Sequence, residues 1–204
     1  LAFRPNRLVP PFDLQGHIPF VAWLVKELQP ATFVQLGTQS GNLYFAACQT
    51  VAENSLPTRC WAVGTWQAEE LAQRHSVQQE AGASDYNRQH FGAFSGLLRM
   101  GDAQALPRFA PGSIDLLLID GRYSPETVRN EYESWRDRLS DHAVVLLVGI
   151  EQADSGAAVL WQQLQPQYPH LAFAHAQGLG VLAVGRNVPK AFQQALQACA
   201  TPEA

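Results

Sequence analysis

A glycine-containing turn is the stretch of this chain best suited to binding a ligand. The turn Gly37-Thr38-Gln39-Ser40-Gly41 follows the apolar run 32–36 and precedes a helical pattern that opens at Asn42. A glycine turn between a strand and a helix N-terminus lets the backbone approach a nucleotide-like ligand closely. The alternative is an ordinary strand-to-helix turn capped by Asn42, because two glycines four residues apart are a weak signal.

Asp120 is the strongest candidate for a functional carboxylate. It ends the apolar run 114–120, directly before Gly121. The structural alternative is that Asp120 caps the following turn. Asp102 follows Gly101 after an earlier predicted strand. It either contacts a ligand or caps a short helix that starts at residue 103.

Two histidines are weaker candidates. His175 falls on a predicted strand and alternates with Leu171 and Phe173, which favours packing at the edge of the core over a role as a base. His17 precedes a predicted helix, where it can cap, pack or contact a ligand.

Alternating strands and helices position these residues. Short apolar runs predict strands at 32–36, 59–63, within 92–100, 114–120 and 143–148, and a hairpin at 171–176 and 181–184. Helical patterns lie at 18–28, 42–52, 67–91 (one or two helices with a flexible middle at 82–84), 103–109, 124–139, 157–165 and 189–200. The alternation predicts an open α/β sheet with helices on both faces. Such sheets bind ligands beyond the carboxyl ends of their strands, which is where the candidate residues fall.

Composition limits the class of protein. Hydrophobic residues make up 47% of the chain and charged residues 16%, which predicts a folded domain with a full core. The net charge of −4 argues against nucleic acid as a partner. The longest apolar run, 143–148, is too short to cross a membrane, and no signal peptide is visible, so we expect a cytoplasmic location.

The cysteines and the chain ends complete this outline. Three widely spaced cysteines predict buried, reduced thiols, and no Cys/His spacing indicates a metal site. We expect an extended N-terminal arm over residues 1–16 and one α/β domain over 17–204, and the first residue, Leu1, suggests a piece of a longer chain.

Taken in order, these elements resemble the class I S-adenosylmethionine-dependent methyltransferases. The resemblance is closer to the small methyltransferase domains that accompany bacterial glycosyltransferases in surface-glycan loci. It covers about residues 10 to 190 and is carried by residues 16–20, 36–45, 65–66, 94–100, 112–117, 119–121, 139–140, 144–146 and 178–185. It implies a Rossmann-like, mostly parallel seven-stranded sheet with helices on both faces and a C-terminal antiparallel hairpin.

The resemblance also implies S-adenosylmethionine as the cofactor. Six residues would contact it: Gly37, Thr38, Gly41, Thr65, Trp66 and Asp102. The glycine turn would take the methionine end, Thr65 and Trp66 would lie beside ribose and adenine, and Asp102 would approach the adenine amine. Asp120 would face the sulfonium and the acceptor hydroxyl, as the base.

The chain departs from that family pattern at five positions. The pattern has an acidic residue at Gln35, an aspartate at Gly64, a histidine at Tyr123 and a histidine–aspartate pair at Val148-Gly149. A carboxylate that binds the ribose hydroxyls contributes about 1.5–3 kcal/mol, so its loss predicts cofactor binding weaker by roughly ten- to a hundredfold. The missing pair also removes hard oxygen ligands for a divalent cation.

Two functions stay open at this point. One is a methyltransferase that acts on the hydroxyl of a sugar or other small molecule. The other is a degenerate methyltransferase domain that serves as an interaction or scaffolding module of a glycan-assembly protein. The expected partners are the acceptor and either a glycosyltransferase or a second copy of the chain.

Overall fold

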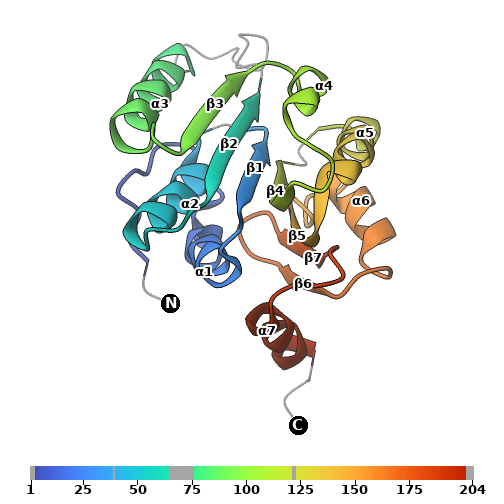
Figure 1. The fold of residues 1–204 in the computed structure, drawn as a ribbon. Helices are drawn as coiled ribbons and strands as arrows, with labels where there is room; N and C mark the ends of the chain where they lie inside the picture. The colour runs from blue at the N-terminus through green and yellow to red at the C-terminus, as the bar shows by residue number, and fades with distance from the viewer. Residues whose placement is uncertain (1–2, 39, 65–75, 121–122, 201–204) are drawn as a thin grey trace.

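A seven-stranded sheet forms the centre of the computed structural model, which describes residues 3–38, 40–64, 76–120 and 123–200 (Figure 1). The strands are β1 (Thr32–Leu36), β2 (Arg59–Gly64), β3 (Ser95–Arg99), β4 (Ile114–Asp120), β5 (Leu139–Val148), β6 (His170–Phe173) and β7 (Leu179–Ala183). Their order in the sheet is β3-β2-β1-β4-β5-β7-β6. The first five strands are parallel, and β7 runs antiparallel between β5 and β6. The predicted mostly parallel sheet with a C-terminal antiparallel hairpin is therefore confirmed.

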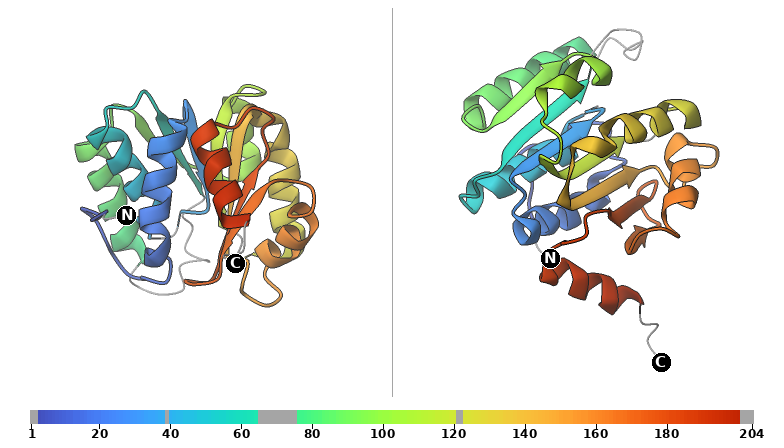
Figure 2. Two further views of the ribbon diagram at one scale, coloured as in Figure 1. Left: turned by 90° about the horizontal axis from the view of Figure 1, so that it is seen from below. Right: turned by 45° about the vertical axis from the view of Figure 1, so that its right-hand side comes forward.

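Helices cover both faces of this sheet (Figure 2). One face carries α1 (Ile18–Leu28), α2 (Asn42–Glu53), α3 (Ser76–His90) and α7 (Lys190–Ala200). The other carries α4 (Asp102–Ala105), α5 (Pro125–Trp135) and α6 (Gly156–Leu164). Three short 3-10 turns, η1 (Gln15–His17), η2 (Leu106–Arg108) and η3 (Arg136–Arg138), join these elements. Among the described residues, no helix is both long enough and apolar enough to span a membrane.

Strand β5 contributes side chains to both halves of the core. Val144, Leu146 and Val148 of β5 face the α1–α2 side, whereas Val145 and Leu147 face the α5–α6 side. Side chains alternate between the faces of a strand, so an unbroken apolar run is what a strand buried on both faces requires. Cys48 and Cys60 are free and buried in this core, as the spacing predicted.

Three predicted boundaries are wrong for physical reasons. Helix α3 runs unbroken through 82–84, because Ala83 packs into the core and offsets the weak helix preference of Gly82. Strand β5 begins at residue 139 rather than 143, because Leu139 pairs with Ile114 while the next residues are partly exposed and hide the apolar pattern. His175 lies in the turn beyond β6, which ends at Phe173.

The segment before α1 packs along α2. The backbone N–H of Asn6 donates to Gln49 Oε1 at 2.8 Å, and Gln49 Nε2 donates to the carbonyl of Arg4 at 3.1 Å. Further on, Val9 N–H donates to Asn42 Oδ1 at 3.1 Å, and Asn42 Nδ2 donates to the carbonyl of Val9 at 2.7 Å. The N-terminal segment therefore follows α2 from its C-terminal half to the glycine turn.

Candidate functional site

The glycine turn closes the carboxyl end of β1 at the point where the strand order reverses. Gly37 and Gly41 both have φ of +73°, a left-handed conformation that side chains disfavour. Gly37 N–H donates to the carbonyl of Val63 on β2 at 3.0 Å, and Gly41 N–H donates to the carbonyl of Thr38 at 2.7 Å. Open α/β sheets bind ligands at such a reversal, so the turn lies where the sequence predicted a site.

Asn42 does not cap the helix, which corrects one sequence-based alternative. Gly41 is the N-cap residue, and Asn42 is the first residue of α2. The buried Asn42 side chain instead holds the N-terminal segment through Val9 and Pro11. Arg7 Nη1 adds a bond of 2.7 Å to the carbonyl of Ser40, within the turn.

Asp120 lies against the glycine turn. It is the last residue of β4 and is only 3% exposed. A Cβ atom built at Gly37 would lie 3.0 Å from Asp120 Cβ and 3.8 Å from a ring carbon of Tyr123. The absence of a side chain at Gly37 therefore lets the backbone of the turn come close to the carboxylate.

Two unsatisfied polar atoms share a small cavity with Asp120. Gln35 donates from Nε2 to the carbonyl of Gly37 at 3.0 Å, but its Oε1 has no hydrogen-bond partner among the described residues. Thr38 Oγ1 is also buried and without such a partner in the same part of the chain. An unsatisfied buried polar group costs about 1–3 kcal/mol, and in a native structure it calls for an explanation such as a bound ligand or water.

The glycine cradle and the polar atoms fit the methionine end of a nucleoside cofactor, but the enclosed space is small. The cavity measures about 10 Å³, and Leu14 of the N-terminal segment forms part of its wall. Sites for small organic ligands span about 300–1,000 Å³. Binding of a nucleoside therefore requires side chains at the carboxyl ends of these strands to move.

Among the remaining predicted cofactor contacts, Asp102 does not line this cavity. Thr65 and Trp66 lie outside the described residues. Asp102 is the first residue of α4, beyond β3, which is separated from β1 by β2. The N-cap of α4 is Gly101, so the alternative in which Asp102 caps this helix is wrong.

Gly149, one of the two departures after β5, has a backbone conformation that favours glycine. Gly149 has φ of +93°, its N–H donates to the carbonyl of Gly178 at 2.9 Å, and its carbonyl accepts from Ser155 Oγ at 2.7 Å. The aspartate of the family pattern would have to adopt this positive φ, which most side chains disfavour. Val148 is fully buried and pairs with Leu179. Among the described residues, no group of three or more His, Cys, Asp or Glu side chains could hold a metal ion.

His17 and His175 meet although they lie near opposite ends of the sequence, a contact that no local pattern signals. Their ring centroids are 4.6 Å apart. The ring of His17 is fully buried, and its Nε2 lies 3.0 Å from the carbonyl of Ala176. Burial lowers the pKa of His17, and the hydrogen bond to Ala176 opposes part of that shift. This buried imidazole ties the start of α1 to the turn between β6 and β7.

The comparison with protein families shows which family the chain belongs to. Residues 34–147 match the family described as a methyltransferase domain, which is more than half of the chain. The chain therefore belongs to the methyltransferase domain family. An uncharacterized protein of Sinorhizobium fredii, y4gI, is 38% identical over 174 residues, covering 84% of this chain and 19% of the relative. The chain thus spans about a fifth of that relative's length.

Solved structures share the fold. The O-methyltransferase NovP matches with a TM-score of 0.64 at 11% identity, over 83% of this chain and 80% of its own. TomG, an O-methyltransferase of Streptomyces achromogenes solved with S-adenosylmethionine, matches with a TM-score of 0.58 at 12% identity, over 83% of this chain and 80% of its own. The Podospora anserina methyltransferase PaMTH1 matches with a TM-score of 0.60 at 12% identity, over 87% of this chain and 89% of its own. At such identities the likeness establishes the fold alone, which is that of the class I methyltransferases.

Proposed function

We propose that this chain is an S-adenosylmethionine-dependent methyltransferase that modifies a hydroxyl oxygen. The observation that carries the proposal is the approach of the left-handed glycine turn to buried Asp120, with two unsatisfied polar atoms in the cavity between them. Family membership supports methyl transfer. The O-methyltransferases among the structural neighbours, one of them bound to S-adenosylmethionine, support the cofactor and the type of acceptor atom.

The chain's own residues would hold the cofactor by its methionine end. Gly37 and Gly41 provide room for the backbone to approach, and Thr38 Oγ1 can donate a hydrogen bond to a carboxylate. Gln35 Oε1 can accept one from an ammonium group. S-adenosylmethionine, when bound, supplies an electrophilic methyl group. Gln35 is neutral, so this site balances less of a ligand's positive charge than a carboxylate at the same position would.

Asp120 has the chemistry of a base for the acceptor. We propose that a carboxylate oxygen of Asp120 accepts the proton of the acceptor hydroxyl and holds that oxygen in place. Positioning of this kind, with a modest base, contributes large rate factors without a metal ion. The residues that line this cavity alongside Asp120 include Leu14, Leu43 and Leu118, which help to keep water away.

The acceptor that we propose is a hydroxyl of a sugar or related small molecule in surface-glycan assembly. The sequence motifs that resemble glycosyltransferase-associated methyltransferase domains support this context. A glycosyltransferase or a second copy of the chain is the proposed partner, and the cytoplasm is the proposed location. The relative, of which the match covers 19%, is compatible with a domain that works within a larger polypeptide.

A second candidate function is an interaction module that no longer catalyses methyl transfer. The observation that favours it is the combination of a cavity of only about 10 Å³ with neutral Gln35 at its wall. Such a module would keep the fold and bind the cofactor weakly or not at all.

Calorimetric titration with S-adenosylmethionine and S-adenosylhomocysteine separates the two functions. The enzyme requires saturable binding of both ligands, and no heat at millimolar ligand would rule it out. Asp120→Asn should then keep cofactor binding and lose methyl transfer to a hydroxyl acceptor. Asp137→Asn, an exposed change in η3, is the control and should change neither.

A further inference from the structure

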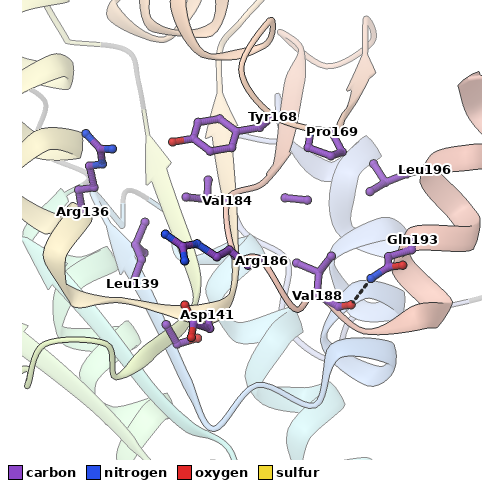
Figure 3. Close-up of a pocket in the computed structure, with 13 residues that line it drawn as sticks. Arg136, Leu139, Asp141, Tyr168, Pro169, Val184, Arg186, Val188, Gln193 and Leu196 are labelled. Carbon is purple, nitrogen blue, oxygen red and sulfur yellow. Dashed lines mark hydrogen bonds between the residues drawn. The ribbon is translucent and has the colours of Figure 1, made fainter.

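A cavity of about 820 Å³ lies at the amino-terminal end of β5, whereas the glycine turn lies at the carboxyl ends of the parallel strands (Figure 3). It is bounded by η3, the first residues of β5, the segment before β6, the end of β7 and the start of α7. Strand β5 has 10 residues and runs from this cavity to the end of the sheet that carries the glycine turn. At about 3.3 Å per residue, this strand places the cavity roughly 30 Å from the candidate methyl-transfer site. The cavity is therefore a separate feature that does not depend on the proposed function.

Apolar side chains form one part of the wall. Leu139 comes from the start of β5, and Val188 and Leu196 come from the loop before α7 and from α7 itself. Gln193 Nε2 donates to the carbonyl of Val188 at 2.7 Å, the bond drawn in Figure 3. This bond and the burial of Phe192 hold α7 beside the cavity, so the wall is part of the folded domain.

Basic and hydroxyl groups form the other part. Arg136 and Arg186 both line the cavity, together with Tyr168. Figure 3 shows the Arg186 guanidinium extending toward Leu139, with the Tyr168 hydroxyl turned to the same side. Asp141 is the single carboxylate in the lining, so two positive charges face one negative charge in a chain whose net charge is −4.

These basic groups are largely free to bind an anion. In the part of the chain that the structure describes, Arg186 makes no ion pair or side-chain hydrogen bond. Arg136 has one ion pair, to Glu133 at 4.0 Å, and both side chains are 57% exposed. An exposed pair at that distance contributes little to stability and gives way readily to a better acceptor.

Tyr132 adds a buried hydroxyl beside this group. Its side chain is almost fully buried, and its hydroxyl has no hydrogen-bond partner that meets normal geometry among the described residues. Burial raises the pKa of Tyr132, the neighbouring Tyr168 hydroxyl raises it further, and Arg136 acts in the opposite direction. The phenol therefore stays protonated, as a donor next to Tyr168.

We propose that this cavity binds a small anion with an apolar body, of the class of aromatic phosphates and carboxylates. The guanidinium groups of Arg136 and Arg186 bind the anionic group, since planar guanidinium forks match phosphate and carboxylate oxygens. The Tyr168 hydroxyl donates a further hydrogen bond. Leu139, Val188 and Leu196 contact the apolar body. A volume of about 820 Å³ falls within the range of small-ligand sites.

Titration of the whole chain with phenyl phosphate, benzoate and phenol tests this proposal. Phenyl phosphate or benzoate should bind with a dissociation constant below about 1 mM, and phenol, which lacks the anionic group, should bind at least about tenfold more weakly. Whichever anion binds more tightly identifies the preferred acid group. Amide NMR shifts should change at residues 139–141 and 183–188.

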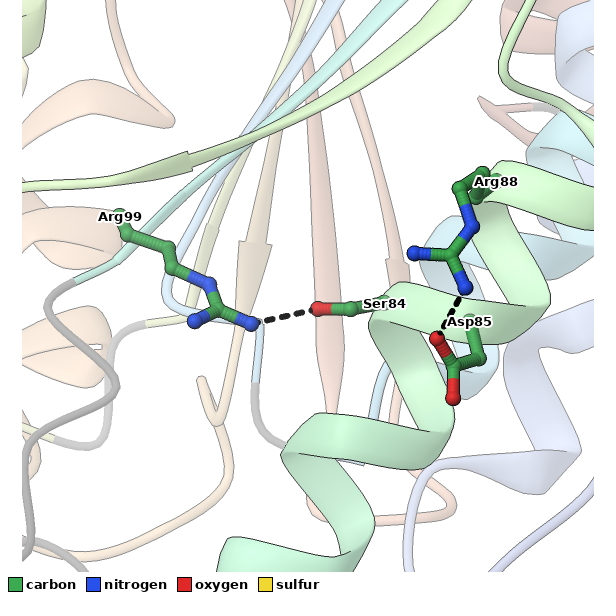
Figure 4. Close-up of polar contacts among 4 residues, drawn as sticks. All are labelled: Ser84, Asp85, Arg88 and Arg99. Atoms are coloured by element: carbon green, nitrogen blue, oxygen red, sulfur yellow. Dashed lines mark hydrogen bonds and ion pairs between the residues drawn. The ribbon is translucent and has the colours of Figure 1, made fainter.

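Substitution of exposed arginines locates the binding. Arg186→Ala should weaken phenyl phosphate binding by roughly tenfold or more, and Arg136→Ala should also weaken it. The matched control is Arg88→Ala on α3, where Arg88 is 75% exposed and pairs with Asp85 at 2.6 Å (Figure 4). Arg88→Ala should leave the affinity unchanged. Absence of saturable binding by either anion, equal losses in Arg88→Ala and Arg186→Ala, or shifts confined to other residues would overturn the proposal.

Discussion

Gly37 and Asp120 are neighbours because β1 and β4 pair in register. Leu36 pairs with Ile119, so the next residue of each strand reaches the same edge of the sheet. A Cβ atom at Gly37 would come within 3.0 Å of Asp120 Cβ, and φ of +73° at Gly37 is a conformation that side chains disfavour. The turn thus depends on glycine for two reasons, its backbone conformation and its contact with the carboxylate.

The first prediction separates these two reasons. Gly37→Ala should lower the free energy of unfolding by at least the roughly 1–2 kcal/mol of a left-handed alanine, and it should abolish cofactor binding. Gly112→Ala is the control, because Gly112 has φ of +69° and a Cβ atom added there would meet no other atom within 4 Å. It should show the backbone cost alone and bind the cofactor normally. Urea unfolding and calorimetry measure both effects, and equal loss of binding in the two variants would contradict the role of the contact.

The second prediction concerns the neutral side chain beside the turn. Gln35→Glu should increase affinity for S-adenosylmethionine roughly ten- to a hundredfold, since charge-assisted interactions contribute about 1.5–3 kcal/mol. S-adenosylhomocysteine should gain affinity as well, because it carries the same ammonium group, and any larger gain for S-adenosylmethionine reports its sulfonium charge. Calorimetry with the two ligands separates these two contributions. Gln163→Glu, on the exposed side of α6, should affect neither ligand. No gain for either ligand would contradict a contact between residue 35 and the ammonium group.

A third prediction tests the attachment of the N-terminal segment. Asn42→Ala removes side-chain bonds to the backbone of Val9 and Pro11 and leaves those groups without partners. The free energy of unfolding should fall by about 1–3 kcal/mol, and proteases should cut within residues 3–14 more quickly. Asn54→Ala removes a bond to Thr50 within α2 and serves as the control. Equal cutting rates in both variants would show that Asn42 does not hold the segment.

The fourth prediction is a dependence of stability on pH through His17. The folded protein holds this imidazole below its ordinary pKa of 6.5, chiefly because the ring is buried. Between the pKa of His17 in the folded protein and 6.5, the unfolded chain therefore binds more protons than the folded protein. The contribution of His17 to the free energy of unfolding is full above pH 6.5 and is lost as the pH falls toward the folded pKa. His17→Gln should give a smaller loss of stability than wild type between about pH 7.5 and 5.5 in urea titrations. Gln163→Ala, an exposed change that removes no titrating group, should keep the wild-type slope. An unchanged slope in His17→Gln would assign the pH dependence to other groups.

Local patterns predicted the features that depend on neighbouring residues in the sequence. The continuous apolar run 114–120 identified a strand buried on both faces, and the change from an apolar run to glycine placed the turn after β1. The strand–helix alternation then placed Asp120 and the turn at one edge of the sheet. These inferences depend on burial and backbone conformation, which residue type strongly limits.

Contacts between distant segments were not predictable in this way. The local sequence around Asn42 predicts a helix cap, but the Asn42 side chain forms hydrogen bonds with the backbone of Val9, 33 residues earlier. The His17–His175 contact and the arginine-lined cavity likewise depend on how the hairpin and α7 pack. Thr65 and Trp66 remain predictions, because they fall outside the described residues.

The position of β7 between β5 and β6 has a consequence for synthesis on the ribosome. Strand β6 pairs with β7, and β7 in turn provides the antiparallel neighbour of β5. Until residues 179–183 emerge, the nascent chain presents the fully apolar half of β5, residues 143–148, as an open edge. Open apolar edges pair readily with other chains. The last strand to be made is therefore the one that protects the nascent domain from aggregation.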